Sequence, residues 1–288
     1  MLFFGEECWR KMKGRNISEA KSLLRAMENR YTNACSRFLL SDSSNDFSSN
    51  PVWLLRKKNE PPSCLLINSR STIMPVLNGR KEIPEPHFLK SFKRRKKIHS
   101  VQGLKEEVLI FEKEMDKIGM AIADIFDYDL MTLDTQANLK NFFSPPSALV
   151  LRTPTMIDID ALTVLQAAYE QEEVIPKGSV FSPAASRVNL TNIISRGHIL
   201  AAELNGRLVG KINISGVSFT RYQVGGVYVH PDFRGRGIAR RMASEFISSL
   251  VKQGRGINLF VKKSNLPARR LYAGLGFTLA GDYRITYY

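Results

Sequence analysis

Apolar and polar positions in the second half of the chain predict a regular alternation of strands and helices. Asn205-Gly206 lies between two apolar runs and is a strong hairpin signal. Apolar residues also recur every four positions from Ile238 to Leu250, which predicts a helix with one buried face. The expected elements, strand or helix by pattern, are strand Leu149–Arg152, helices Ile159–Tyr169 and Pro183–Arg196, strands His198–Leu204, Arg207–Ser215 and Phe219–Val229, helix Gly235–Val251, strand Ile257–Val261, a helix carrying Ala268 to Leu275, and short strands Phe277–Leu279 and Arg284–Tyr288.

The first half of the chain also predicts a mixed α/β arrangement. Residues 1–40 indicate one or two helices, and four short apolar runs between residues 52 and 101 indicate strands. A helix is expected over 104–118, followed by strands at 120–127 and 130–133. Ser144-Pro145-Pro146-Ser147 is the clearest break in the pattern. We therefore expect an N-terminal α/β domain over residues 1–148 and a second domain over 149–288.

The segment from Val227 to Ala239 carries the most specific chemistry. An apolar strand runs into a glycine-rich turn that contains Arg234 to Gly237, and an amphipathic helix follows. A turn of this kind gathers backbone N–H groups at a helix N-terminus, where a phosphate or pyrophosphate binds well. Glycines let the backbone approach the anion, and arginines add charge-assisted hydrogen bonds. The segment therefore predicts a binding site for a polyphosphate.

This turn resembles the acetyl-CoA pyrophosphate loop of the GNAT superfamily of N-acetyltransferases, whose pattern is Gln/Arg-x-x-Gly-x-Gly/Ala. Arg234, Gly237 and Ala239 fill the pattern here. A second GNAT signature is matched further along the chain by Asn265, Ala268, Tyr272, Gly276 and Phe277. The resemblance covers residues 149–288. The first half has no such loop, so it is either a degenerate GNAT-like domain or an unrelated α/β accessory domain.

The resemblance implies the fold class, which is a mixed α/β sheet of the GNAT acyl-CoA N-acyltransferase type. It also implies acetyl-CoA as the cosubstrate. The expected pyrophosphate ligands are the backbone N–H groups of Gly235, Arg236, Gly237, Ile238 and Ala239, with Arg234 beside them. Val227, Tyr228 and Val229 would line the pantetheine and supply an N–H to the thioester carbonyl, and Asn265 and Ala268 belong to the same cofactor site. Gly225-Gly226 would form the bulge that opens the strand for the cofactor.

Tyr272 is the expected acid, because the family places here a tyrosine that can protonate the departing thiolate. The alternative for Tyr272 is an ordinary core aromatic. The general base is less clear, since the strand around Gln223 carries no carboxylate. Glu172 and Glu173 follow the first helix of this half in an expected linker, and Glu203 lies on its second strand. A solvated loop and a chain of waters are the alternatives to a carboxylate base.

The chain of 288 residues carries a net charge of +15, and both halves hold more basic than acidic residues. Such a balance suits nucleic acid or another polyanion, and acetyl-CoA is itself a polyanion. The run at 90–97, KSFKRRKK, is expected to be a solvated loop rather than a nucleic-acid site. Three widely spaced cysteines and four scattered histidines predict neither a disulfide framework nor a metal site. With no signal peptide and no apolar span, the sequence predicts a cytoplasmic protein that does not associate with membranes.

The function expected from these features is acetyl transfer from acetyl-CoA to a primary amine by direct attack. The acceptor stays open among a small amine, an aminoglycoside, a peptide N-terminus and a protein lysine, and a homodimer stays open as well. No cysteine lies in the second half, so no covalent acyl-enzyme is expected. A non-catalytic acyl-CoA-binding module or sensor is the alternative, because the strand carboxylate is missing.

Overall fold

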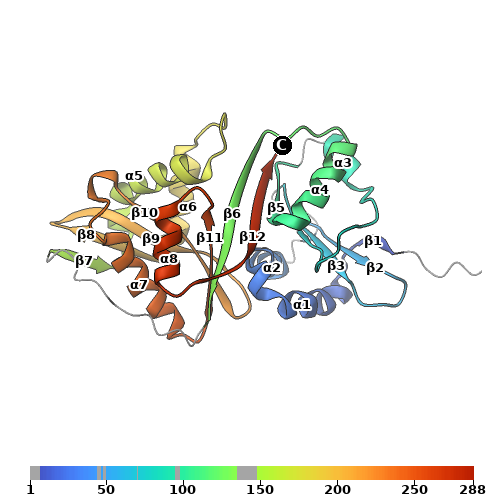
Figure 1. Cartoon of the computed structure of the whole chain (residues 1–288), viewed down its shortest axis with the longest axis horizontal. Coiled ribbons are helices and arrows are strands. Elements are labelled where there is room, and N and C mark those ends of the chain that lie inside the picture. Colours follow the sequence, from blue (N-terminus) through green and yellow to red (C-terminus); the bar gives the residue numbers. More distant parts are fainter. Residues whose placement is uncertain (1–6, 44–46, 48–49, 70, 95–97, 135–147) are drawn as a thin grey trace, which may run out of the picture. The chain divides into compact units, whose positions relative to one another are not determined.

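The computed structural model describes residues 7–43, 47, 50–69, 71–94, 98–134 and 148–288. The chain forms two compact units (Figure 1). The first unit comprises residues 1–130, 260–265 and 279–288, as far as these are described. The second comprises residues 131–259 and 266–278, with the same qualification. Each unit is a mixed α/β structure, as the sequence predicts.

The strands of the first unit follow the order β1-β2-β3-β4-β5-β12-β6 in the sheet. Pairing is antiparallel from β1 to β4, parallel between β4 and β5, and antiparallel between β5 and β12. Leu66, Val101, Phe111 and Met115 are part of its core. The elements are β1 (Cys8–Lys11), α1 (Ile17–Ala26), α2 (Glu28–Ser43), β2 (Val52–Arg56), β3 (Cys64–Ser69), β4 (Thr72–Val76), α3 (Leu89–Arg94), β5 (Ser100–Leu104), α4 (Lys105–Lys117), β6 (Asp124–Leu133) and β12 (Thr278–Tyr287).

The strands of the second unit follow the order β11-β10-β9-β8-β7. The β10–β11 pair is parallel and the other pairs are antiparallel. Helix α5 packs on β9 and β10, and α7 packs on β8, β9 and β10. The elements are β7 (Leu149–Arg152), α5 (Ile159–Tyr169), a π-helical turn (Glu170–Val174), α6 (Pro183–Ser195), β8 (Ile199–Leu204), β9 (Arg207–Val217), β10 (Arg221–Val229), α7 (Ile238–Val251), β11 (Gly256–Lys262) and α8 (Leu266–Gly274).

Several expected elements differ from the structure. Helix α7 begins at Ile238 and not at Gly235, because Gly235 and Gly237 adopt left-handed backbone angles. The two short strands expected at the C-terminal end are one continuous strand, β12, and the two expected between 120 and 133 are one strand, β6. Residues 8–11 form a strand within the region expected to be helical, and residues 90–94 of the basic run belong to the short helix α3 (Leu89–Arg94).

The two units of the structure do not follow the expected ranges 1–148 and 149–288 throughout. Residues 144–147, where the break was expected, lie outside the described residues, so the boundary itself stays a prediction. The range 149–288 is not one unit, however, because residues 260–265 and 279–288 group with the first. The physical reason is strand pairing: Tyr283 to Tyr287 of β12 pair with Leu104 to Ser100 of β5. The last strand therefore completes the sheet of the first unit.

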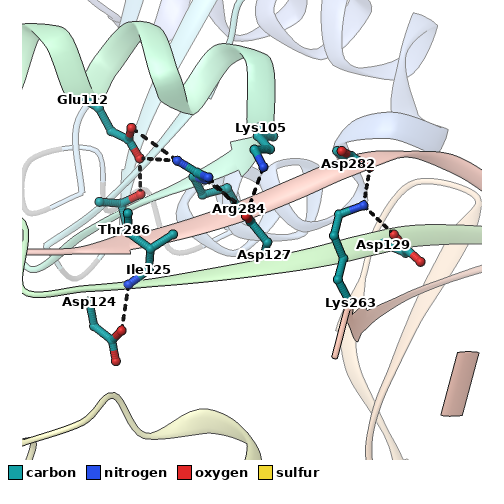
Figure 2. A network of polar contacts seen from close by, with 10 residues as sticks. All are labelled: Lys105, Glu112, Asp124, Ile125, Asp127, Asp129, Lys263, Asp282, Arg284 and Thr286. Carbon is teal, nitrogen blue, oxygen red and sulfur yellow. Dashed lines mark hydrogen bonds and ion pairs between the residues drawn. The ribbon is translucent and has the colours of Figure 1, made fainter. Parts of the chain in front are cut away.

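A network of charges secures β12 in the first unit (Figure 2). The Arg284 guanidinium donates to both carboxylate oxygens of Asp127 on β6, at 2.8 and 3.1 Å. It also contacts Glu112 of α4, which accepts a 2.6 Å hydrogen bond from Thr286. Lys105 reaches the second oxygen of Asp127 at 3.0 Å. These contacts, Arg284 foremost, hold the pKa of Asp127 below its usual value.

Arg284→Met should destabilise the first unit, because it leaves Asp127 and Glu112 without their main cation. The expected loss in unfolding free energy is about 2–3 kcal/mol, below the range for fully buried pairs since Asp127 is partly exposed. Both tryptophans of the chain, Trp9 and Trp53, belong to this unit, so urea unfolding followed by their fluorescence reports on it directly. A change under about 0.5 kcal/mol, typical of a surface substitution, would contradict this role.

The difference in unfolding free energy between wild type and Arg284→Met should depend on pH. A carboxyl group whose pKa is lowered in the folded state stabilises that state above its unfolded pKa, near 3.9, and the stabilisation is lost as the pH falls. The difference in unfolding free energy should therefore have its full size at neutral pH and shrink progressively below about pH 4. Lys105→Met serves as the milder control, because its single contact with Asp127 leaves Arg284 in place.

Candidate functional site

The turn between β10 and α7 has the backbone geometry of an anion site. Gly235 and Gly237 have φ angles of 78° and 74°, a region that favours glycine, and Gly237 is the N-cap of α7. A Cβ built on Gly235 would meet no atom within 4 Å, so the surface of the turn is open there. The N-terminus of a 14-residue helix lies directly behind it. Of the residues predicted to bind the pyrophosphate, Gly235 and Arg236 are exposed in the turn, Gly237 caps the helix, and Ile238 and Ala239 are the first residues of α7.

Arg234 fixes this turn to its neighbours. Its Nε donates to the Val229 carbonyl at the end of β10 at 2.9 Å, and Nη2 pairs with Glu172 at 2.8 Å. The guanidinium also lies 5.2 Å from the centre of the Tyr228 ring. Arg236 donates to the Asp232 carbonyl at 3.1 Å. Both arginines thus hold the loop in shape, and their predicted contact with a cofactor stays a prediction.

Strand β10 bulges where the sequence predicts it. The pairing of β10 with β9 shifts register between Gly225 and Tyr228, and Gly226 has a φ of 60°. A Cβ on Gly226 would overlap the Asn213 side chain, so only glycine fits. In the described pairing with β11, β10 contributes only Arg221 to Val224. Gly225 to Val229, including the predicted pantetheine-lining residues, thus lie beyond the part of β10 that pairs with β11.

Glu172 and Glu173 were expected in a linker, but the structure places them elsewhere. They belong to the π-helical turn of residues 170–174, which continues α5. π-Helical turns are rare overall, and those that do occur are frequently found at functional sites. Tyr169, the last residue of α5, and Tyr272 of α8 are electrostatically coupled to this turn. Burial raises the pKa of Tyr169 to about 12, and the charges of Glu173 and Glu170 add to the effect.

Tyr272 is 6% exposed, and burial raises the pKa of its phenol above the ordinary value. The charges of Tyr169 and Glu173 act in the same direction. The phenol therefore keeps its proton at neutral pH, as a proton donor must. Of the candidate bases, Glu172 is paired with Arg234, and Glu203 is paired with Arg152 at 2.7 Å. Glu173 is the candidate whose charge reaches Tyr272.

Lys211, which lies on β9 beneath the bulge, is not among the site residues predicted from the sequence. Its side chain is fully buried, and its Nζ donates to the Gly226 carbonyl at 2.8 Å and to Asn213 Oδ1 at 3.1 Å. Burial lowers the pKa of Lys211 to about 7, while the nearby charge of Glu170 acts in the opposite direction. The signal that could have found it is a single lysine among the apolar residues and the glycine of positions 208–212.

The second expected signature is divided between the two units. Ala268 and Tyr272 lie on α8 in the second unit, whereas Asn265 belongs to the first. The Asn265 N–H donates to the Lys262 carbonyl at 2.9 Å. The cofactor roles of Asn265 and Ala268 stay predictions.

In the described part of the chain, no group of three or more His, Cys, Asp or Glu side chains could hold a metal ion. No described helix is both long enough and apolar enough to cross a bilayer.

Comparison with known proteins now identifies the class. Residues 164–277 match the Acetyltransferase (GNAT) family. An acetyltransferase of Pectobacterium atrosepticum is 37% identical over 27% of this chain and 55% of its own length. The N-alpha-acetyltransferase RimI of Mycobacterium tuberculosis is 34% identical over 36% of this chain and 66% of its own. The chain thus spans about half the length of the first of these relatives. The chain therefore contains a GNAT acetyltransferase domain over residues 164–277, and GNAT acetyltransferases are among its relatives.

A likeness in structure extends over both units. A tandem GNAT protein from the clavulanic acid biosynthesis pathway matches 97% of this chain and 98% of its own, with a TM-score of 0.59. At 14% identity this match speaks for the fold alone. The fold class predicted for the second half is confirmed. For the first half, the whole-chain match indicates a fold similar to that of a tandem GNAT protein.

Proposed function

We propose that this GNAT acetyltransferase uses acetyl-CoA to acetylate a primary amine by direct attack. The turn of residues 234–239 carries the proposal, since two left-handed glycines open it at the N-terminus of α7. The Gly235 position offers room for a phosphate where a side chain would otherwise stand. Backbone N–H groups there and the helix dipole favour a pyrophosphate. Bound acetyl-CoA would supply the activated acetyl group as a thioester.

The bulge of β10 would act on the reacting carbonyl. Val227 to Val229 follow Gly226 at the point where the β10–β9 register shifts. A backbone N–H from this segment would stabilise the negative charge that develops on the carbonyl oxygen. A well-placed donor of this kind lowers the activation free energy by about 3 kcal/mol. The three cysteines all lie in the first unit, away from this segment in the chain, which favours direct attack over an acyl-enzyme.

The acceptor amine must lose its proton before it attacks. For a lysine side chain this costs about 4–5 kcal/mol at neutral pH, whereas for a peptide N-terminus it costs about 1 kcal/mol. We assign the base role to Glu173, acting directly or through water, because it lies in the π-helical turn after Tyr169 and its charge acts on the Tyr272 phenol. Tyr272 would give its proton to the departing thiolate.

The test is acetyl-CoA turnover against a panel of amines, read as free thiol and as acetylated product by mass spectrometry. The panel includes small amines, an aminoglycoside, lysine peptides and peptides with free N-termini, the last because one relative is an N-alpha-acetyltransferase. We expect thiol release that depends on one class of amine. Tight acetyl-CoA binding without amine-dependent thiol release from any class would instead support the sensor alternative.

A further inference from the structure

A buried ammonium group lies under the bulge of the candidate site. Lys211 Nζ has a carbonyl and an amide oxygen as its hydrogen-bond partners, and the Tyr169 ring centre lies 4.8 Å away. Burying an ammonium is expensive, and replacement by an apolar side chain of similar size is often neutral or stabilising. Fold stability is therefore a poor reason for a lysine at this position, and its contact with the bulge offers a better one.

The contact acts on one peptide group. Gly226 C=O belongs to the same peptide as Val227 N–H, and the chain has no cis peptide bond among the described residues. In a planar trans peptide the two groups point in opposite directions. A cation bound to the carbonyl therefore fixes the direction of the N–H, and it also polarises the N–H into a stronger donor. Cooperative strengthening of this kind is about 10–30% per hydrogen bond.

We propose that Lys211 is a positioning residue for acetyl transfer, which orients and polarises the Gly226–Val227 peptide so that Val227 N–H stabilises the charge on the reacting carbonyl. This inference rests on the proposed function, because it needs a thioester bound at the bulge. The proposal also accounts for the glycine at position 226, because Lys211 Nζ and the Asn213 side chain fill the space that a Cβ would need.

Lys211 changes its charge near neutral pH. The groups that face it are the Tyr169 phenol at the end of α5, Glu170 of the π-helical turn, and its strand neighbours Ala201 on β8 and Tyr228 on β10. Burial sets the pKa near 7 against the opposing effect of Glu170. Below pH 7 the ammonium is a strong donor. Above it, the neutral amine still offers two N–H groups for its two oxygen partners, but it donates more weakly.

The experiment compares Lys211→Met, which has no donor, and Lys211→Gln, which has a neutral donor, with the wild type. Losing a whole oxyanion donor costs about 10²–10³ in kcat, and here the donor remains but is weakened. We expect kcat to fall about 30-fold in Lys211→Met and less in Lys211→Gln, with the KM for acetyl-CoA changed less than about threefold. The ratio of wild-type to Lys211→Met kcat should fall as the pH rises through 7, whereas the Gln-to-Met ratio should stay flat. Titration of the acceptor amine cancels in both ratios.

Ile212→Ala is the matched control. Ile212 is the next residue on β9, is fully buried, and points to the other face of the sheet. Its truncation should cost about 2–5 kcal/mol of stability with kcat retained. Lys211→Met should keep or raise Tm while losing kcat. Equal kcat in wild type and Lys211→Met, or equal loss in Lys211→Met and Ile212→Ala, would overturn the role of Lys211. Absence of turnover in the wild type would instead refute the proposed function, and the catalytic role with it.

Discussion

Gly237→Asp should abolish acetyl-CoA binding while the protein stays folded. The substitution places a carboxylate at the N-cap of α7, where we expect the pyrophosphate. Repulsion between the two anions, together with loss of the open turn, should weaken binding at least about 100-fold, or about 2.7 kcal/mol. Asp is among the preferred N-cap residues and interacts favourably with the helix dipole, which offsets part of the strain at a φ of 74°. Isothermal titration calorimetry with acetyl-CoA measures the effect, and circular dichroism checks the fold.

Gly237→Asn separates charge from shape. Asn has the size of Asp, caps helices well and tolerates left-handed angles, but it carries no charge. We expect Gly237→Asn to bind acetyl-CoA with an affinity between those of the wild type and Gly237→Asp. If the Asp variant bound as tightly as the wild type, the turn would not be the pyrophosphate site. Equal losses in Asn and Asp would instead mean that only the backbone of Gly237 matters.

Local signals in the sequence were sufficient to locate the turn and the bulge. Two glycines flanked by arginines after an apolar strand indicate a tight, open turn, and Gly225-Gly226 within a strand indicates a bulge. Both features depend on backbone angles that few other residues adopt, so they can be recognised without tertiary information. The hairpin at Asn205-Gly206 followed from the same kind of signal, and the structure forms it with β8 and β9.

Features that depend on distant parts of the chain could not be predicted in the same way. The pairing of β12 with β5 joins residues near 285 to residues near 102, and local pattern carries no information about that partner. Lys211 was missed for a similar reason. Its burial, and hence its lowered pKa, depends on Tyr169 and Gly226, which come from other elements of the chain. A lysine in an apolar run is a weak signal until its surroundings are known.

Tyr272→Phe should lower kcat about 100-fold and leave acetyl-CoA affinity nearly unchanged. The substitution keeps the ring and its edge-on contact with Phe277, at 5.7 Å between centroids, and removes only the hydroxyl group. A general acid contributes typically 10²–10⁴-fold, and a thiolate is a good enough leaving group to place the loss near the lower end, about 10². Steady-state kinetics with the amine found in the panel gives kcat, and calorimetry gives the affinity.

Tyr283→Phe is the control for this prediction. Tyr283 is also a buried tyrosine with a raised pKa, but it lies in the first unit, where its hydroxyl accepts a hydrogen bond from Asn33. Its loss should affect stability and not kcat. If Tyr272 protonates the thiolate in the slow step, the wild type should show a solvent deuterium isotope effect on kcat that Tyr272→Phe lacks. Full kcat in Tyr272→Phe would leave Tyr272 as a core aromatic and would require another donor for the thiolate.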